Sequence, residues 1–206
     1  GLRRGCDEPA DATHGRILVA HVSEDLQELG WDAGWEACFA PHRAQGLVPA
    51  RVAIEYNHMF RAFSEAGELA LQHAGRFKHR AVARSGLAAV GDWVAVRRTP
   101  NEGAGTMEAV LPRRSRFSRK VAGRRQDEQV IAANLDQVVV VLAVAEPPFK
   151  ETTLDRYLAA AEHCGLNAIV CVNKVDLAPA SGPDSAGDLA GRAEVYARIG
   201  YPAIMT

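Results

Sequence analysis

The sequence lacks any long apolar run and any low-complexity tract. No segment reaches the roughly 18 consecutive apolar residues that a membrane-spanning helix needs. With 18 glycines and 10 prolines among 206 residues, the composition also excludes collagen-like and disordered chains. Hydrophobic residues make up 48% and charged residues 24% of the chain, so we expect a soluble, folded protein of one to two domains.

Paired cysteine spacing and a secretion signal are also missing. The cysteines are Cys6, Cys38, Cys164 and Cys171, and no basic and apolar leader opens the chain. We therefore expect reduced thiols and a cytoplasmic protein. The chain begins with Gly1 and ends in an apolar run at 201–206, so we expect it to be a piece of something longer.

Net charge is close to zero, but the charge is unevenly distributed. The formal total is −1, yet residues 71–125 hold 13 Arg and Lys against Asp92, Glu102 and Glu108. One strongly basic segment therefore lies inside an otherwise acidic chain, which favours a polyanionic partner.

Periodicity divides the chain into two parts of different type. Apolar residues between Leu26 and Phe39 predict one short amphipathic helix, ended by Pro41 and Gly46, with its tryptophans in the core. The next segment is rich in β-branched and aromatic runs separated by turn residues, which favours a small all-β, OB-like barrel; an SH3-like barrel is the alternative. The predicted strands are 52–56, 59–63, 69–73, 93–96 and 106–110.

The second part reads as an α/β unit that follows a polar, basic connector. The apolar run Val138–Val144 is typical of a parallel strand buried on both faces. A helix from Leu154 to about Cys164 and a strand at Ala168–Val172 complete a βαβ unit. A further helix ends at Gly200, and the last residues predict a third strand. We expect this sheet to be incomplete and prone to association through an unpaired edge.

The loop after the second of these strands carries the sequence Asn173-Lys174-Val175-Asp176. Ligands of open parallel sheets bind beyond the carboxyl ends of the strands. A carboxylate can accept two hydrogen bonds, which matches the adjacent N1–H and N2–H donors of guanine and not the edge of adenine. The lysine stem can cover the base, and the asparagine can hold the loop or contact N7. The tetrapeptide therefore predicts a guanine-specificity element.

A GTPase also needs a Gly-rich phosphate-binding loop that ends in Gly-Lys-Ser/Thr. The sequence contains no Gly-Lys pair. We therefore expect no hydrolysis by this chain alone and assign it no catalytic residue.

Several segments together resemble the ribosome small subunit-dependent GTPase A family, whose GTPase domain is circularly permuted. They are 90–94, 110–115, 129–136, 154–158 and 173–177. The resemblance implies an OB barrel followed by a partial GTPase domain in which the guanine element precedes the phosphate loop. It also implies that the Mg²⁺ ligands for GTP and a zinc-binding domain lie outside this chain, so that none of its residues is a metal ligand. The implied division is an N-terminal extension at 1–47, the barrel at 48–112, a basic linker at 113–130 and the partial α/β P-loop-type domain at 131–206.

The resemblance further implies a monomeric factor in late assembly of the small ribosomal subunit, with GTP and GDP as ligands, no membrane contact and a barrel that docks on ribosomal RNA. The basic segment supports RNA binding from the residues themselves. Phe77 and Phe117 lie among these charges; we expect both to be core residues, as is usual for single aromatics, and stacking on RNA bases is the alternative. The candidate RNA-binding residues are Arg76, Lys78, Arg80, Arg84, Arg113, Arg114, Arg116, Arg119 and Lys120.

Two alternatives belong to other classes. The chain could be a non-catalytic RNA-binding OB module whose α/β part is a degenerate remnant. An unrelated α/β enzyme with an appended barrel would need a nucleophile or acid–base cluster, and the sequence shows none.

Overall fold

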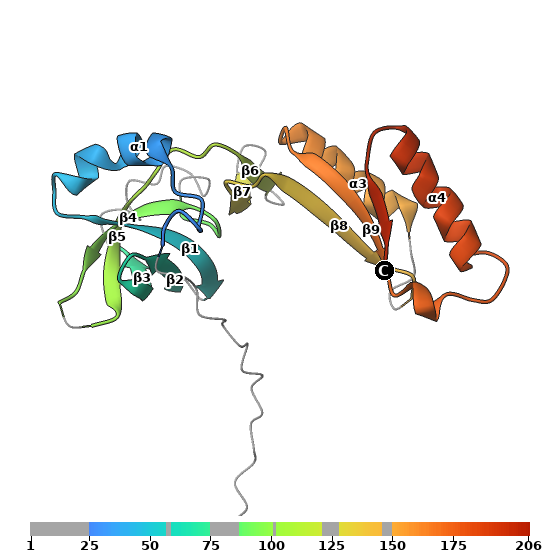
Figure 1. Cartoon of the computed structure of the whole chain (residues 1–206), viewed down its shortest axis with the longest axis horizontal. Coiled ribbons are helices and arrows are strands. Elements are labelled where there is room, and N and C mark those ends of the chain that lie inside the picture. Colours follow the sequence, from blue (N-terminus) through green and yellow to red (C-terminus); the bar gives the residue numbers. More distant parts are fainter. Residues whose placement is uncertain (1–24, 57–58, 75–86, 101, 121–127, 146–149) are drawn as a thin grey trace, which may run out of the picture.

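The computed structural model describes residues 25–56, 59–74, 87–100, 102–120, 128–145 and 150–206. Within these ranges no helix is long and apolar enough to cross a membrane. Figure 1 shows a barrel and a separate α/β group, with a short hairpin between them.

The barrel is closed and has the strand order β1-β2-β3-β5-β4. All neighbouring strands are antiparallel except β3 and β5, which pair in parallel. This arrangement fits the predicted OB-like fold. The strands are β1 (Val48–Tyr56), β2 (Met59–Ser64), β3 (Gly67–His73), β4 (Trp93–Arg98) and β5 (Ala104–Val110).

Helix α1 (Ala33–Arg43) packs on the barrel through a cluster of aromatic side chains. The ring of Trp31 lies 4.7 Å from that of Trp93, and Trp35 and Phe39 are buried beside them. The prediction that the tryptophans of this segment are core residues is thus confirmed for Trp35, whereas Trp31 is partly buried against the same cluster.

The predicted bounds of this helix were wrong at both ends. Asp32 caps the first turn by accepting a hydrogen bond from the Trp35 amide at 3.0 Å, so the helix begins after Asp32 and not at Leu26. The helix also continues through Pro41 to Arg43. A proline near the end of a helix removes one backbone hydrogen bond, and the last turn forms without it.

The segment predicted as a polar connector contains two paired strands. They are β6 (Arg116–Lys120) and β7 (Glu128–Ala133), which form an antiparallel hairpin. Phe117 is the one apolar residue of β6, and the apolar residues of β7 are consecutive at 130–133, so neither strand shows a clear period-2 pattern.

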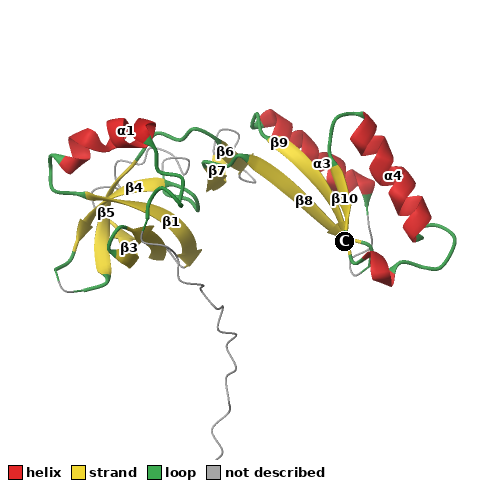
Figure 2. Ribbon diagram, in the orientation of Figure 1, coloured by secondary structure: helices red, strands yellow, loops and turns green. Residues whose placement is uncertain are grey.

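The α/β group has the predicted order of elements. Its parallel sheet runs β10-β9-β8, with β8 (Gln137–Ala143), β9 (Asn167–Asn173) and β10 (Ala203–Met205). Figure 2 shows two helices lying along this sheet, α3 (Glu151–His163) and α4 (Ala186–Arg198). They are joined where the Tyr196 hydroxyl donates to Asp155 at 2.8 Å. Burial and this hydrogen bond raise the pKa of Tyr196 to about 12.

Burial of β8 on both faces was predicted and is wrong for the described residues. Val140 lies in one core with Leu154 of α3 and Leu189 of α4. Val139 and Val141 point to the other face and are 47% and 54% exposed. Both helices contribute to the same core, so one face of the sheet is uncovered by the described elements.

Candidate functional site

The predicted guanine-specificity element lies at the carboxyl end of the central strand. Strand β9 ends at Asn173, Lys174 follows in a left-handed conformation, and a short 3₁₀ turn, η2 (Val175–Leu177), completes the loop. Val175 is anchored against the core of the sheet and its helices. The loop thus holds polar side chains at the edge where parallel sheets bind ligands.

The amide of Asn173 is oriented by two hydrogen bonds to its oxygen. Oδ1 accepts from the backbone amide of Lys174 at 2.7 Å and from the Thr206 hydroxyl at 3.1 Å. Since the oxygen is held, the Asn173 amide nitrogen keeps its two hydrogens for other partners. The backbone of Thr206 also bonds to Val172 at 2.9 Å and to Val175 at 3.0 Å, which ties the loop to the end of β10.

Lys174 has φ = 63°. Left-handed backbone is unfavourable for a residue with a Cβ by roughly 1–2 kcal/mol. Such a residue persists only when its surroundings fix it, and the Asn173 side chain does so here. The lysine side chain is exposed, so its stem is available to lie along a flat ligand.

Asp176 is exposed and makes no hydrogen bond or ion pair with any described residue. An ionised carboxylate only accepts hydrogen bonds, and it has two oxygens for that purpose. The structure therefore presents an unpaired double acceptor next to the oriented amide of Asn173. This arrangement can bind a planar group that offers two adjacent N–H donors.

A hollow of about 700 Å³ lies at the opposite, amino end of the same strands. It is lined by residues such as Gln137, Asn167 and Pro202, and its acid Glu162 already accepts from the Tyr201 hydroxyl at 2.5 Å. Ligands of parallel sheets bind beyond the carboxyl ends of the strands, so the volume of this hollow alone does not make it the better candidate.

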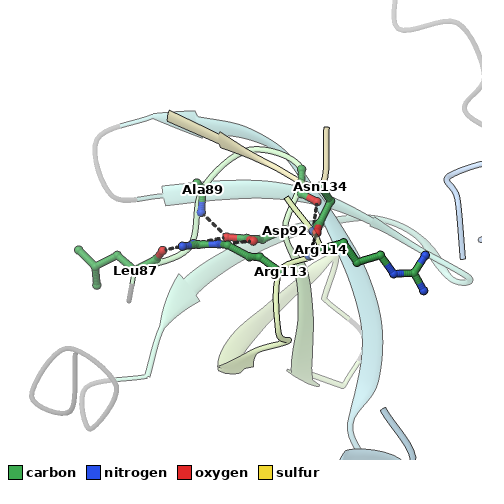
Figure 3. A network of polar contacts seen from close by, with 7 residues as sticks. Leu87, Ala89, Asp92, Arg113, Arg114 and Asn134 are labelled. Atoms are coloured by element: carbon green, nitrogen blue, oxygen red, sulfur yellow. Dashed lines mark hydrogen bonds and ion pairs between the residues drawn. The ribbon is translucent and has the colours of Figure 1, made fainter. Parts of the chain in front are cut away.

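A second cluster of polar residues joins the barrel to the hairpin (Figure 3). Asp92 is fully buried, and its carboxylate accepts from the Arg113 guanidinium at 2.8 and 2.6 Å and from the Ala89 amide at 2.8 Å. Arg113 also donates to the Leu87 carbonyl at 2.7 Å. The ion pair is bidentate and almost completely shielded from water. In this geometry the hydrogen bonds between the two groups best offset the cost of burying their charges.

Asn134 is the centre of the same junction, with φ = 54°. Its side chain donates to the Gly91 carbonyl at 3.0 Å and accepts from the Arg114 amide at 2.9 Å. A Cβ on Gly91, whose φ is 88°, would lie 2.1 Å from the Ala133 carbonyl oxygen. The close approach of the backbone at residue 91 to the backbone at residue 133 therefore requires glycine at position 91.

The candidate RNA-binding arginines have different environments. Arg113 is held by Asp92 as above. Arg114 pairs with Asp32 at 2.6 Å and lies over the Trp35 ring, and this pairing lowers the pKa of Asp32. Arg116 approaches Glu128 at 3.6 Å.

Arg119 is exposed, and among the described residues its hydrogen bonds go to the neutral side chain of Gln129, the shorter at 3.1 Å. Phe117 is partly buried against the core of the α/β group, where a core residue was expected. Arg76, Phe77, Lys78, Arg80 and Arg84 lie outside the described residues, as does the side chain of Lys120.

Metal ligands are not gathered anywhere in the described part of the chain, since no three His, Cys, Asp or Glu residues come together there. Neither Mg²⁺ nor Zn²⁺ is therefore assigned to the residues that the structure describes. The described cysteines Cys38, Cys164 and Cys171 are free thiols.

Sequence reasoning missed Thr206 and Asn134. Thr206 is distant in sequence from Asn173, and only the pairing of β10 with β9 brings the two together. Asn134 is a residue type that tolerates left-handed backbone, and this was the one available signal.

Comparison with known proteins gives a consistent result. The family described as RsgA GTPase matches residues 110–206. A protein of Opitutus terrae named small ribosomal subunit biogenesis GTPase RsgA is 40% identical over 162 residues, which is 75% of this chain and 44% of the relative. The protein of the same name from Syntrophotalea carbinolica is 30% identical over 190 residues, 88% of this chain and 50% of the relative.

Two solved structures share the fold. YjeQ from Thermotoga maritima has a TM-score of 0.54 at 25% identity, and YloQ, described as a circularly permuted GTPase, has a TM-score of 0.54 at 22% identity. Each match covers 78% of this chain and 51% of the solved chain. The chain thus spans about half the length of the curated relatives and structures that it matches.

Proposed function

Residues 110–206 of this chain belong to the RsgA GTPase family, and from this premise we propose that the protein binds guanine nucleotides, hydrolyses GTP and acts in biogenesis of the small ribosomal subunit. The observation that carries the proposal is the loop after β9, where Asp176 is exposed and unpaired among the described residues. The names of the relatives in Opitutus and Syntrophotalea support the cellular role.

The three polar side chains of the loop would divide the recognition of the base. Asp176 accepts N1–H and N2–H of guanine with its two oxygens. The Asn173 amide, whose oxygen is held by Lys174 and Thr206, directs its nitrogen to an acceptor such as N7. The Lys174 stem covers one face of the ring. Adenine would place an acceptor nitrogen against the carboxylate, a contact without a hydrogen.

Hydrolysis is proposed for the whole protein and not for these 206 residues. Phosphate transfer needs backbone amides and a lysine around the β and γ phosphates, together with Mg²⁺. The sequence has no Gly-Lys pair, and no metal-ligand cluster occurs in the described part of the chain. Residues 1–206 would therefore recognise the base without contributing to phosphate chemistry.

Guanine recognition is tested by titrating the chain with GDP and, separately, with ADP. We expect GDP to shift the backbone amide NMR signals of residues 173–177 in a saturable manner, while ADP leaves them unchanged. Equal shifts with both nucleotides would reject the assignment of this loop to guanine. NMR suits the measurement because binding without phosphate contacts will be weak.

We also propose that the barrel and the hairpin form the RNA-docking side, with 48–112 as the OB domain, 113–130 as the segment that joins it to the domain at 131–206, and 1–47 as an N-terminal extension. The ion pairs of Arg113, Arg114 and Arg116 hold the barrel, helix and hairpin together. Arg119 has no acidic partner among the described residues, so it is the best placed of the four to meet a phosphate.

Arg119 gives a measurable expectation for RNA binding. Replacing it with alanine should reduce the slope of log K against log salt by about 0.7–0.9, because one phosphate contact is lost. Fluorescence anisotropy with a labelled RNA hairpin between 50 and 200 mM salt measures the slope. Arg198→Ala is the matched control, since Arg198 is an exposed arginine at the end of α4. An unchanged slope in Arg119→Ala would remove this residue from the RNA interface.

The second candidate function is that of an RNA-binding module without nucleotide recognition. The closed barrel and the 13 basic residues between 71 and 125 favour it. The two functions are distinguished by the titrations above, because the module would bind RNA and show no preference for GDP.

A further inference from the structure

A groove of about 370 Å³ lies between the β6–β7 hairpin and helix α3. The hairpin contributes Phe117, Arg119 and Ile131, and the helix contributes Thr153, Arg156 and Tyr157. The volume falls within the range of roughly 300–1,000 Å³ that small-ligand sites occupy. The groove shares no lining residue with the guanine loop at 173–177.

Two neighbouring stripes of side chains run along helix α3, one apolar and one of mixed apolar and polar residues. Leu154, Leu158 and Ala161 are buried against the sheet. The neighbouring stripe at 153, 156, 157 and 160 has the i, i+3, i+4, i+7 spacing of one helix face, and it lines the groove. Sheet packing therefore accounts for the first stripe, while the second faces the β6–β7 hairpin across the groove.

The groove combines an exposed apolar wall with positive charge. Tyr157 is 50% and Ile131 is 45% exposed, and Phe117 is partly buried beside them. Arg119 and Arg156 are exposed at the same groove, and no Asp or Glu lines it. The adjacent Asp155 is occupied by the Tyr196 hydroxyl. The chemistry that fits is a flat apolar body joined to an anion.

We propose that this groove binds an unpaired nucleotide of single-stranded RNA, with the base against Tyr157 and Phe117 and its phosphates near Arg119 and Arg156. Bases of single strands stack on aromatic rings and on guanidinium planes. RNA is favoured over an acidic peptide because β6 belongs to the basic segment of the chain and leads directly into the groove. The inference rests on the proposed docking of the chain on RNA, and it adds a site on α3 that reads unpaired rather than duplex RNA.

The test compares an octameric oligouridylate with a blunt, GC-rich RNA duplex of eight base pairs, both labelled and titrated by anisotropy with the full chain. Tyr157→Leu should lower affinity for the oligouridylate by about fivefold or more, because stacking contributes about 1–3 kcal/mol per base. Affinity for the duplex should stay the same, and Tyr157→Phe should retain binding because it keeps the ring. Arg156→Gln should also weaken the oligouridylate complex more than Arg198→Gln, its matched control on α4.

The outcomes separate this inference from the proposed function. If the wild-type chain binds neither RNA, RNA docking itself is rejected and the groove with it. If the chain binds RNA while Tyr157→Leu and Arg156→Gln bind the oligouridylate as the wild type does, only the groove is rejected. A labelled octaglutamate peptide serves as the acidic-peptide comparison. If Tyr157→Leu and Arg156→Gln weaken binding of this peptide but not of the oligouridylate, the groove binds a protein partner and the inference is overturned. Circular dichroism verifies that each variant is folded.

Discussion

Replacing Asp92 with alanine should lower the free energy of unfolding by about 3–5 kcal/mol, the usual loss when one member of a buried ion pair is removed. Asp92 is fully buried and Arg113 is 12% exposed. The substitution removes the carboxylate partner of the Arg113 guanidinium, which keeps its hydrogen bond to the Leu87 carbonyl, and leaves the Ala89 amide without the acceptor that it has in the wild type. Both groups would then stay desolvated without compensation.

The measurement is urea unfolding followed by tryptophan fluorescence. All three tryptophans lie in α1, just before it, or in β4, at the packing of α1 on the barrel. Their emission therefore reports on the part of the molecule that the ion pair supports.

Two further variants control the measurement. Glu68→Ala breaks the exposed pair between Arg61 and Glu68 and should cost no more than about 1 kcal/mol. Asp92→Asn keeps an acceptor for the Ala89 amide and should lie between the wild type and Asp92→Ala. A loss below about 1 kcal/mol in Asp92→Ala would show that the pair contributes little to the barrel.

Changing Asp176 to asparagine should shift the base preference of the loop from guanine to xanthine. An amide retains one acceptor for guanine N1–H and directs a donor against N2–H, so one charge-assisted hydrogen bond is lost. Such a bond contributes about 1.5–3 kcal/mol, which corresponds to about a ten- to hundredfold weaker guanine complex. Xanthine has a carbonyl in place of the N2 amine, and that oxygen can accept from the new amide.

Competition between GDP and XDP, followed through the amide signals of residues 173–177, measures this preference. Glu194→Gln is the matched control, because it removes one exposed negative charge from α4 without touching the loop. An Asp176→Asn variant with the wild-type order of affinities would mean that this carboxylate does not contact the base. In that case the proposed function would lose the observation that carries it.

Much of the site could be predicted because its chemistry is contained in one contiguous segment. Asn173 and Asp176 follow an uninterrupted apolar strand, and the position of the loop then follows from the rules for parallel sheets. The barrel could be predicted because its apolar runs and turn residues alternate over short distances. The structure confirms the barrel and the order of elements in the α/β group.

The remaining features depend on contacts between residues that are distant in sequence. Arg113 was predicted to contact RNA from the local density of positive charge, but its partner Asp92 lies 21 residues earlier. Whether an arginine faces solvent or a buried acid is decided by the closure of the barrel. The hydroxyl of Thr206 likewise reaches Asn173 only after β10 has paired with β9.

The uneven covering of β8 has a consequence for how this strand tolerates amino-acid change. Residues 138–141 are four consecutive valines, yet Val140 is enclosed by helix side chains and Val139 and Val141 are about half exposed. Deleting methyl groups from an enclosed valine leaves a void, whereas a half-exposed valine can give way to threonine at little cost. Tolerance of substitution should therefore alternate from one residue to the next along these four valines, low at Val140 and higher at Val139 and Val141.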